Sequence, residues 1–233
     1  MKMSIVIPCY NEEKNIPLIL ERFRESITGE NIEVVIVNNG STDKTNEILK
    51  KILFKYPFAK SVFVPINKGY GHGILQGLNI SKGDFIGWTH ADMQTDPYDV
   101  IKAYKLLEKN NWNKKIFVKG NRKKRAFGEK IFSAGMSIFE SLYFGKLLRE
   151  INAQPNIFSN DFYKAWKNPP EDFSLDLYAL YMAKKAKLKI KRIDVVFPKR
   201  IHGKSSWNTG FISKIKQTKK TLDFSKKLKK ENK

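Results

Sequence analysis

The fold is decided by residues 33–49, which read EVVIVNNGSTDKTNEIL. The β-branched run from Glu33 to Val37 predicts a strand, because such residues favour the extended backbone of a sheet. The polar residues 41–43 then offer N-caps for a helix that continues through Leu53. A strand, a polar loop and a helix in this order indicate the βα unit from which parallel sheets are built.

The same alternation extends on both sides of this stretch. Ser4 to Ile7 predicts the preceding strand, and the helix after it has Pro17 in its first turn, where proline is tolerated. The residues expected on the buried face of that helix are Ile16, Leu18, Ile19, Leu20 and Phe23. Further strands are predicted at 61–64, 84–88, 116–119, 154–158 and 188–197, further helices at 75–80, 97–109, 128–144 and 174–185, and a glycine-rich turn at 67–73. This rhythm favours one α/β domain with a Rossmann-like, mostly parallel central sheet flanked by helices.

The composition limits the partners and the compartment. Lys and Arg total 44 against 23 Asp and Glu, which gives a formal net charge of +21. Such a surface suits nucleic acid, anionic lipid headgroups or phosphorylated small molecules, or is simply a solvated basic surface. Cys9 is the only cysteine, which excludes an internal disulfide and fits a reducing compartment. Because no run of about 18 apolar residues is present, we expect a cytoplasmic protein that contacts the membrane only peripherally.

The last segment, residues 210–233, has a character of its own. Lysines alternate with apolar residues at roughly helical spacing, the apolar ones being Phe211, Ile215, Leu222, Phe224 and Leu228. This pattern is typical of a basic amphipathic helix that lies on an anionic membrane surface, where each lysine contributes about 1 kcal/mol. A frayed and solvated tail is the alternative that the pattern leaves open.

One polar loop, Thr89 to Pro97, has the composition of a metal site. His90, Asp92 and Gln94 offer an imidazole, a carboxylate and an amide oxygen on alternate residues, which share one face of an extended segment. The loop follows a predicted strand, and ligands of open α/β sheets bind beyond the carboxyl ends of strands. A divalent cation held there would stabilise the charge that builds on a diphosphate leaving group. Taken alone, the loop is equally compatible with an ordinary turn before proline.

A series of short motifs runs through about residues 3 to 207. The motifs are Ser4 to Glu13, Val37 to Asp43, Asn67 to Gly69, Gly83 to Ile86, His90 to Pro97, Gly120 to Arg122, Phe173 to Leu177 and Arg200 to Ser205. In this order and at these separations they resemble the family 2 glycosyltransferases, within them the branch of the dolichol-phosphate mannose synthases and bacterial polyprenyl-phosphate sugar transferases. The resemblance implies a GT-A fold and an enzyme that uses a nucleotide-sugar donor and a divalent metal.

The resemblance also implies roles for individual residues. The implied donor-binding positions are Pro8, Tyr10, Glu12, Asn39, Asn67 and Gly69; the metal-binding positions are His90, Asp92 and Gln94; the acceptor or phosphate-binding positions are Arg122, Lys130, Ser133 and Arg200; the catalytic positions are Asp92 and Asp176. The implied organisation is a glycosyltransferase domain at 1–209, with a nucleotide-sugar-binding half at 1–110 and an acceptor-binding half at 111–209, followed by the tail at 210–233. Whether the protein forms a homo-oligomer is left open.

Two departures from the family pattern concern the donor and the metal. His90 replaces the first acid of the family's Asp-x-Asp motif, and imidazole suits manganese better than magnesium, so we expect Mn²⁺ to be favoured over Mg²⁺. Asn38 and Asn39 replace an acidic pair, one member of which accepts a proton from the nucleobase. Because an amide both donates and accepts, a cytidine-linked donor stays open beside a uridine-linked one.

A third departure leaves the catalytic base undecided. Asn152 stands where relatives often have Asp. A sugar hydroxyl as acceptor needs a base, for which Asp176 is the first choice before Asp172 and Glu171. A lipid monophosphate needs none, because its second pKa lies near about 6 and it is largely a dianion at neutral pH.

Three functions therefore compete. The leading one is metal-dependent, inverting transfer of a sugar from a nucleoside-diphosphate donor to a polyprenyl phosphate. The runner-up is the same fold with a saccharide hydroxyl of surface polysaccharide or lipopolysaccharide as acceptor. The remote alternative is a basic nucleic-acid-binding protein, against which the sequence has no RRM, KH or helix-turn-helix signature. The expected partners are thus a nucleotide sugar, a polyprenyl phosphate or glycan, and an anionic membrane surface, without nucleic acid.

Overall fold

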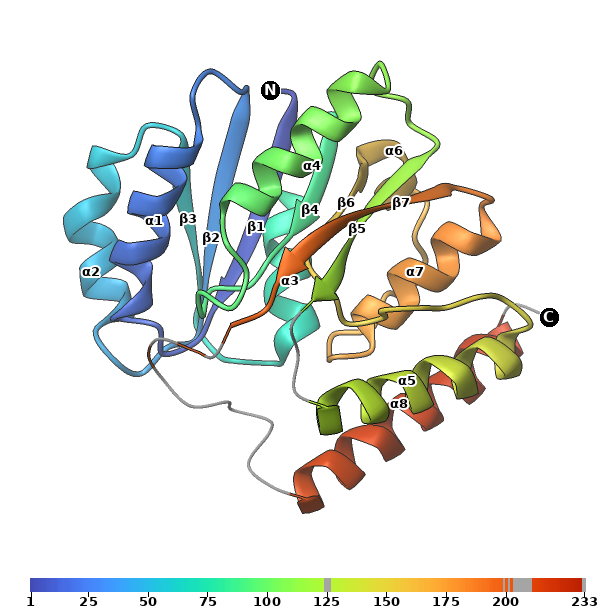
Figure 1. The fold of residues 1–233 in the computed structure, drawn as a ribbon. Coiled ribbons are helices and arrows are strands. Elements are labelled where there is room, and N and C mark those ends of the chain that lie inside the picture. Colours follow the sequence, from blue (N-terminus) through green and yellow to red (C-terminus); the bar gives the residue numbers. More distant parts are fainter. Residues whose placement is uncertain (124–126, 199, 201, 203–210, 232–233) are drawn as a thin grey trace.

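The computed structural model describes residues 1–123, 127–198, 200, 202 and 211–231, with side chains except at 127–132, 211, 212 and 214. Its centre is a seven-stranded sheet in the order β3-β2-β1-β4-β6-β5-β7 (Figure 1). The strands are β1 (Met3–Cys9), β2 (Ile32–Asn39), β3 (Ala59–Val64), β4 (Phe85–Trp88), β5 (Ile116–Lys123), β6 (Asn156–Ser159) and β7 (Lys189–Val196). Only β6 runs antiparallel to its neighbours. The predicted α/β class and mostly parallel sheet are confirmed.

Helices cover both faces of this sheet. They are α1 (Asn15–Ser26), α2 (Thr45–Ile52), α3 (Tyr70–Asn79), α4 (Tyr98–Lys109), α5 (Phe127–Phe144), α6 (Asn160–Lys164), α7 (Leu175–Lys185) and α8 (Phe211–Glu231), with a short 3₁₀ turn at Leu53–Lys55. Alternate residues of β1 face opposite ways, as the pleat requires. Ile5 therefore packs in a core with α1, α2 and α4, whereas Val6 packs in a second core with α3, α6 and α7.

The parallel strands bring the functional loops to one edge of the sheet. In the strand register Cys9 pairs with Asn38, and Val6 pairs with Trp88. The carboxyl ends of β1, β2 and β4 therefore lie side by side, and the loops that follow them form one rim. Gly40 begins the loop after β2 with a positive φ of 70°, and a Cβ there would stand 2.4 Å from the backbone nitrogen of Asn67. Only glycine allows the loops after β2 and β3 to approach so closely.

Two local predictions were wrong, each for a packing reason. Leu18 was expected on the buried face of α1 but is 40% exposed, because the helix turns only Ile16, Ile19, Leu20 and Phe23 to the core. Helix α3 begins at Tyr70, within the segment predicted as a glycine-rich turn. A Cβ on Gly71 would lie 2.7 Å from backbone atoms of residues 170–172, so this glycine allows a helix to pack closely against another segment.

Residues 211–231 form one long helix, α8, which lies along α5 (Figure 1). Phe224 and Leu228 pack on the protein core rather than facing outward. The hydroxyl of Ser225 lies 3.0 Å and 2.9 Å from the two carboxylate oxygens of Glu140 on α5. The predicted basic helix is therefore present, but part of its apolar side is used to hold it to the domain.

Candidate active site

In the loop after β4, the side-chain oxygens of Asp92 and Gln94 both contact the guanidinium of Arg200. The guanidinium of Arg200 lies 2.8 Å from Asp92 Oδ2, and its Nε donates to Gln94 Oε1 at 3.0 Å. The loop is held in this shape because the backbone N–H of Gln94 donates to Asp92 Oδ1, and the Gln94 amide donates to the carbonyl of Pro198. Asp92 is only 6% exposed, so its charge is weakly screened. A carboxylate and an amide oxygen directed at one positive group can hold a metal ion as well as a guanidinium.

His90 lies in the same loop, two residues after the end of β4. Its ring packs edge-on against Phe197, with 6.2 Å between the ring centroids. Burial lowers the pKa of His90, and the charges of Asp92 and Asp176 oppose that shift. Arg122 lies over the ring of Phe197, 5.8 Å from its centroid, and donates to Glu150 at 2.8 Å. The structure thus gathers His90, Arg122 and the Asp92 loop in one region.

The loops after β1 and β2 are tied to each other. Asn11, with a φ of 57°, accepts from the backbone N–H of Thr42 at 2.8 Å, and its own N–H donates to Ser41 at 3.0 Å. Tyr10 is left 39% exposed at this rim, next to the end of β1. Burial raises the pKa of Glu12, while its bond from Asn15 and the charge of Arg200 oppose the shift. Glu12 therefore belongs to the same electrostatic site as Arg200.

Asn39 has one open hydrogen-bonding atom. Its Nδ2 donates to the carbonyl of Gly69 at 2.9 Å and lies 3.3 Å from Asn67 Oδ1, which itself accepts from the N–H of Gly69. The Asn39 side chain is buried, and its Oδ1 has no partner within the described part of the chain. Asn38 differs, since its Oδ1 accepts from the N–H of Ser41 in a local turn. Of the two amides only Asn39 has a buried acceptor without a partner in the described part of the chain.

Asp176 lies in the first turn of α7. It is 3% exposed, and its Oδ1 accepts three hydrogen bonds, from Trp88 Nε1 at 3.2 Å, Gln154 Nε2 at 3.0 Å and Asn156 Nδ2 at 2.8 Å. Burial raises the pKa of Asp176, and the charges of Lys119 and His90 act in the opposite direction. The carboxylate is thus held at a fixed orientation by the end of β4 and the start of β6.

The remaining candidates are two possible bases, Asp172 and Glu171, and two phosphate-binding positions, Lys130 and Ser133. Asp172 accepts from the backbone N–H of Ser174 at 2.8 Å, and Glu171 lies 3.2 Å from His72, so both rival base candidates have local structural partners. Ser133 is half-buried on α5, and the side chain of Lys130 lies outside the described residues.

Several polar residues of the site were missed by the sequence reasoning; they are Tyr70, Trp88, Lys119, Glu150, Gln154 and Asn156. The available signal was weak, a lysine at the end of an apolar strand and amides before another strand. The pairing of β4, β5 and β6 brings Trp88, Lys119 and Asn156 together.

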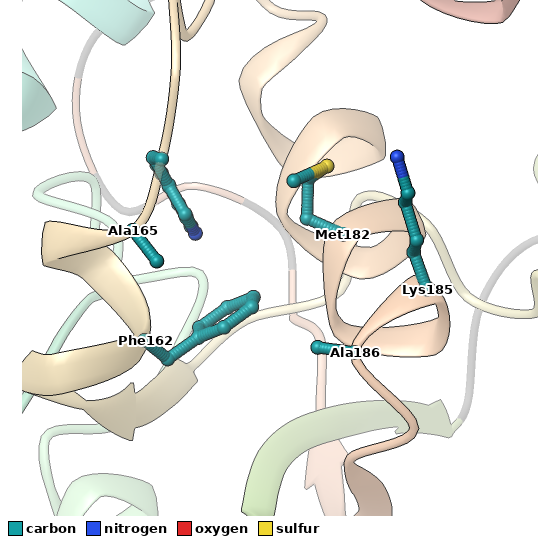
Figure 2. Close-up of a pocket in the computed structure, with 6 residues that line it drawn as sticks. Phe162, Ala165, Met182, Lys185 and Ala186 are labelled. Carbon is teal, nitrogen blue, oxygen red and sulfur yellow. The ribbon is translucent and has the colours of Figure 1, made fainter. Parts of the chain in front are cut away.

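No cluster of three or more His, Cys, Asp or Glu side chains forms a metal site in the part of the chain that the structure describes. No helix in the same ranges has the length and apolar character that crossing a bilayer requires. An apolar pocket of about 300 Å³ opens between α6 and α7, lined by Phe162 and Met182 among others (Figure 2). It contains none of the predicted site residues.

Comparison with known proteins agrees with this geometry. Residues 4–175 match the model of glycosyl transferase family 2. The chain is 37% identical over 112 residues to the undecaprenyl-phosphate 4-deoxy-4-formamido-L-arabinose transferase of Photorhabdus laumondii, covering 46% of this chain and 34% of that protein. It is 31% identical over 139 residues to the dolichol-phosphate mannosyltransferase of Pyrococcus furiosus, covering 58% of this chain and 39% of that one. The chain thus matches little more than a third of the length of these curated relatives.

The solved structures agree on the fold. Glucosyl-3-phosphoglycerate synthase of Mycobacterium tuberculosis, in complex with Mn²⁺ and UDP-glucose, superposes with a TM-score of 0.72 at 18% identity, over 96% of this chain and 78% of that one. TarS 1–349 of S. aureus superposes with a TM-score of 0.59 at 19% identity, over 83% and 58% of the two chains. At these identities the likeness concerns the fold alone.

Proposed function

The chain belongs to glycosyl transferase family 2 and has the GT-A fold, and from this premise we propose that it moves a sugar from a nucleoside-diphosphate donor to a polyprenyl phosphate, with inversion and with the help of a divalent metal. The observation that carries the proposal is the convergence of the Asp92 and Gln94 oxygens on the Arg200 guanidinium, in the loop that follows β4. In this proposal residues 1–110 bind the donor and residues 111–209 bind the acceptor. The names of the polyprenyl-phosphate transferases above support the choice of acceptor.

The donor base meets Pro8, Tyr10 and Asn39 in this proposal. Since the Asn39 amino group is engaged by Gly69 and Asn67, the side chain offers only its oxygen to a ligand. An acceptor matches the ring N–H of uracil, whereas cytosine has an acceptor at the same ring position. This geometry favours a uridine-linked donor over the cytidine-linked one, and Glu12 is the proposed ligand of the ribose.

The metal ligands in this proposal are Asp92, Gln94 and His90. Their chemistry fits a divalent ion, since the oxygens of Asp92 and Gln94 already face the positive charge of Arg200. A bound divalent ion would stabilise the charge that develops on the diphosphate leaving group. The solved synthase from M. tuberculosis contains Mn²⁺ with its nucleotide sugar, which supports a metal of this kind. With His90 in place of an acid, Mn²⁺ is favoured over Mg²⁺.

The acceptor phosphate is bound by Arg122 and Arg200, with Lys130 and Ser133 as further candidates. Arg200 contacts the metal ligands in the structure, so it is within reach of any phosphate that meets the metal. A phosphate dianion can attack the sugar without a base. Asp176 is then not needed as a base, which agrees with its carboxylate being 3% exposed and accepting three hydrogen bonds on one oxygen. The runner-up, transfer to a saccharide hydroxyl, requires Asp176 to reach that hydroxyl as the base.

The membrane contact is proposed for the α5–α8 pair, by which we mean residues 127–144 and 211–231. Ile138, Phe139 and Leu142 of α5 are 61%, 44% and 80% exposed, and Ile215 of α8 is 54% exposed. Lysines of α8 accompany them, the exposed ones being Lys216, Lys219, Lys220, Lys226, Lys227 and Lys230. Exposed apolar groups beside lysines suit an anionic lipid surface. The apolar contribution thus comes chiefly from α5, since Phe224 and Leu228 of the tail pack inward.

A donor panel tests the proposal. The protein is incubated with UDP-, GDP- and CDP-linked sugars and Mn²⁺, with and without polyprenyl phosphate, and free nucleotide and glycosylated lipid are followed. Transfer from a uridine-linked donor that depends on the lipid phosphate is the expected result. Transfer to a saccharide but not to the lipid would favour the runner-up, and salt-sensitive nucleic-acid binding without turnover would revive the remote alternative.

A further inference from the structure

Lys119 is a buried cation that the proposed reaction does not yet use. It lies on β5 with 0% exposure, and its Nζ donates to the carbonyl of Ala153 at 3.0 Å and to Asn156 Oδ1 at 2.5 Å. Neither partner is a carboxylate, so the charge is not neutralised by a direct ion pair with either of them. Burying a cation in this way costs stability. Burial lowers the pKa of Lys119 to about 7, and the charge of Asp176 is the main influence that raises it.

The ammonium fixes the direction of two amides. An ammonium can only donate, so Asn156 must turn its Oδ1 to Lys119 and its Nδ2 away. That Nδ2 donates to Gln154 Oε1 at 3.0 Å and to Asp176 Oδ1 at 2.8 Å. Because Gln154 accepts there, its own Nε2 points to Asp176 Oδ1 at 3.0 Å and to the hydroxyl of Tyr70 at 2.8 Å. By donating to Asn156, Lys119 thus leaves an amide nitrogen of both Asn156 and Gln154 directed at Asp176 Oδ1.

Asp176 in turn joins three parts of the site. Trp88, the last residue of β4, donates to it at 3.2 Å and leads directly into the proposed metal-binding loop 89–97. Tyr70 is linked to Asp176 through Gln154. It is the first residue of α3, follows the proposed donor-binding residue Gly69 and stacks on Phe173 with 4.7 Å between ring centroids. Residue 176 itself belongs to the acceptor half. A rotation of 180° exchanges the oxygen and the nitrogen of an amide with little change in its shape. For Asn156 this rotation would place its Nδ2 against the Lys119 amino group, where two donors oppose each other.

We propose that Lys119 is a positioning residue for sugar transfer, which acts through Asn156 and Gln154 to keep the Asp176 carboxylate oriented between the proposed metal-binding loop 89–97 and the proposed donor-binding loop 67–69. This inference rests on the proposed function. It differs from the role of a simple core lysine, which would support folding without a specific link to Asp176. In a Lys119→Met variant the buried Asn156 Oδ1 and the carbonyl of Ala153 lose their donor, which loosens the hold on Asn156, and Asp176 loses the positive charge of Lys119 that favours its ionised form.

The test is a double-mutant cycle with Lys119→Met, Asp176→Asn and the double variant, in the full chain. Asparagine keeps an oxygen for the three donors but removes the charge. We expect Lys119→Met to lower kcat about ten- to a hundredfold with a donor KM within about threefold of the parent, as loss of an outer partner of a site residue does. In the Asp176→Asn background the same change should alter kcat by less than about threefold, because coupled residues are not additive.

Two comparisons keep the test decisive. Lys115→Met, an exposed lysine just before β5, is the matched control and should retain the parent kcat. If Lys119→Met does not unfold cooperatively, Lys119→Gln replaces it; we expect this neutral donor to lose at least about threefold in kcat, with no loss in the Asp176→Asn background. An unchanged kcat for Lys119→Met, or equal losses in both backgrounds, would overturn the inference. A parent that transfers no sugar would instead overturn the proposed function, and the unfolding free energies of the same four proteins would still decide whether Lys119 acts through Asp176.

Discussion

Replacing Glu140 with glutamine should change how the stability of the α5–α8 pair depends on pH. Glu140 is 0% exposed, and Ser225 is its hydrogen-bond partner across the two helices. Burial raises its pKa from 4.5 to about 7, although the bond from Ser225 opposes the shift. The folded protein therefore binds this proton more tightly than the unfolded chain does.

The magnitude follows from linkage. The rise in the pKa of Glu140 from 4.5 to about 7 corresponds to at most about 3 kcal/mol in the free energy of unfolding. The stabilisation linked to the protonated carboxyl is fully present below pH 4.5 and is lost as the pH rises through about 7. Glutamine keeps the shape and cannot ionise, so Glu140→Gln should gain up to about 3 kcal/mol relative to the parent between pH 4.5 and pH 8.

Urea unfolding followed by circular dichroism at pH 4.5, 6 and 8 measures this difference. Other titrating groups are common to both proteins and cancel when the parent is subtracted from the variant. A flat difference across the three pH values would refute the reasoning, because it would mean that Glu140 has the same proton affinity in the folded and unfolded chain. A Ser225→Ala control should make the free energy of unfolding depend more steeply on pH than in the parent, because it removes the hydrogen bond that holds the pKa of Glu140 down.

Three further predictions concern the site and its surroundings. Asn39→Leu should weaken UDP binding by at least about tenfold in calorimetry, because a buried acceptor is lost, whereas Asn39→Asp should not; equal affinity of the parent for UDP and CDP would contradict the role of Asn39. The parent should transfer sugar faster with Mn²⁺ than with Mg²⁺, and His90→Asp should narrow that ratio in initial-rate assays; equal parent rates with both ions would count against His90 as a ligand. Leu142→Glu should reduce cosedimentation with anionic vesicles about tenfold or more, while Phe54→Glu, at a residue 78% exposed on the 3₁₀ turn, should not; equal losses would remove α5 from the membrane face.

The sequence predicted the sheet well because strand formation depends on local composition. The β-branched runs at residues 33–37 and 4–7 each became buried strands of the sheet. The helix limits were less certain where contacts from distant segments decide them. Tyr70 starts α3 because the helix can pack against residues 170–172, which no local pattern reveals.

The candidate site divides in the same way. The loop with Asp92 and Gln94 could be found from its spacing, since all its ligands lie within a few residues. Lys119 could not be found, because its partners Ala153 and Asn156 lie more than thirty residues away and meet it only through strand pairing. For the same reason a sequence cannot tell that the Asn39 amide has a single open oxygen, which depends on where Gly69 places its carbonyl.

The most direct test of the account compares Asp92→Ala with Asp96→Ala. Both remove a carboxylate from the same loop, but Asp96 pairs with Arg22 at 3.0 Å on α1, away from Gln94 and Arg200. Mn²⁺-dependent release of nucleotide from the donor sugar is measured for both variants and the parent. The account predicts a loss of about a hundredfold or more for Asp92→Ala and near-parent rates for Asp96→Ala. Turnover of donor by Asp92→Ala as fast as by the parent would contradict it.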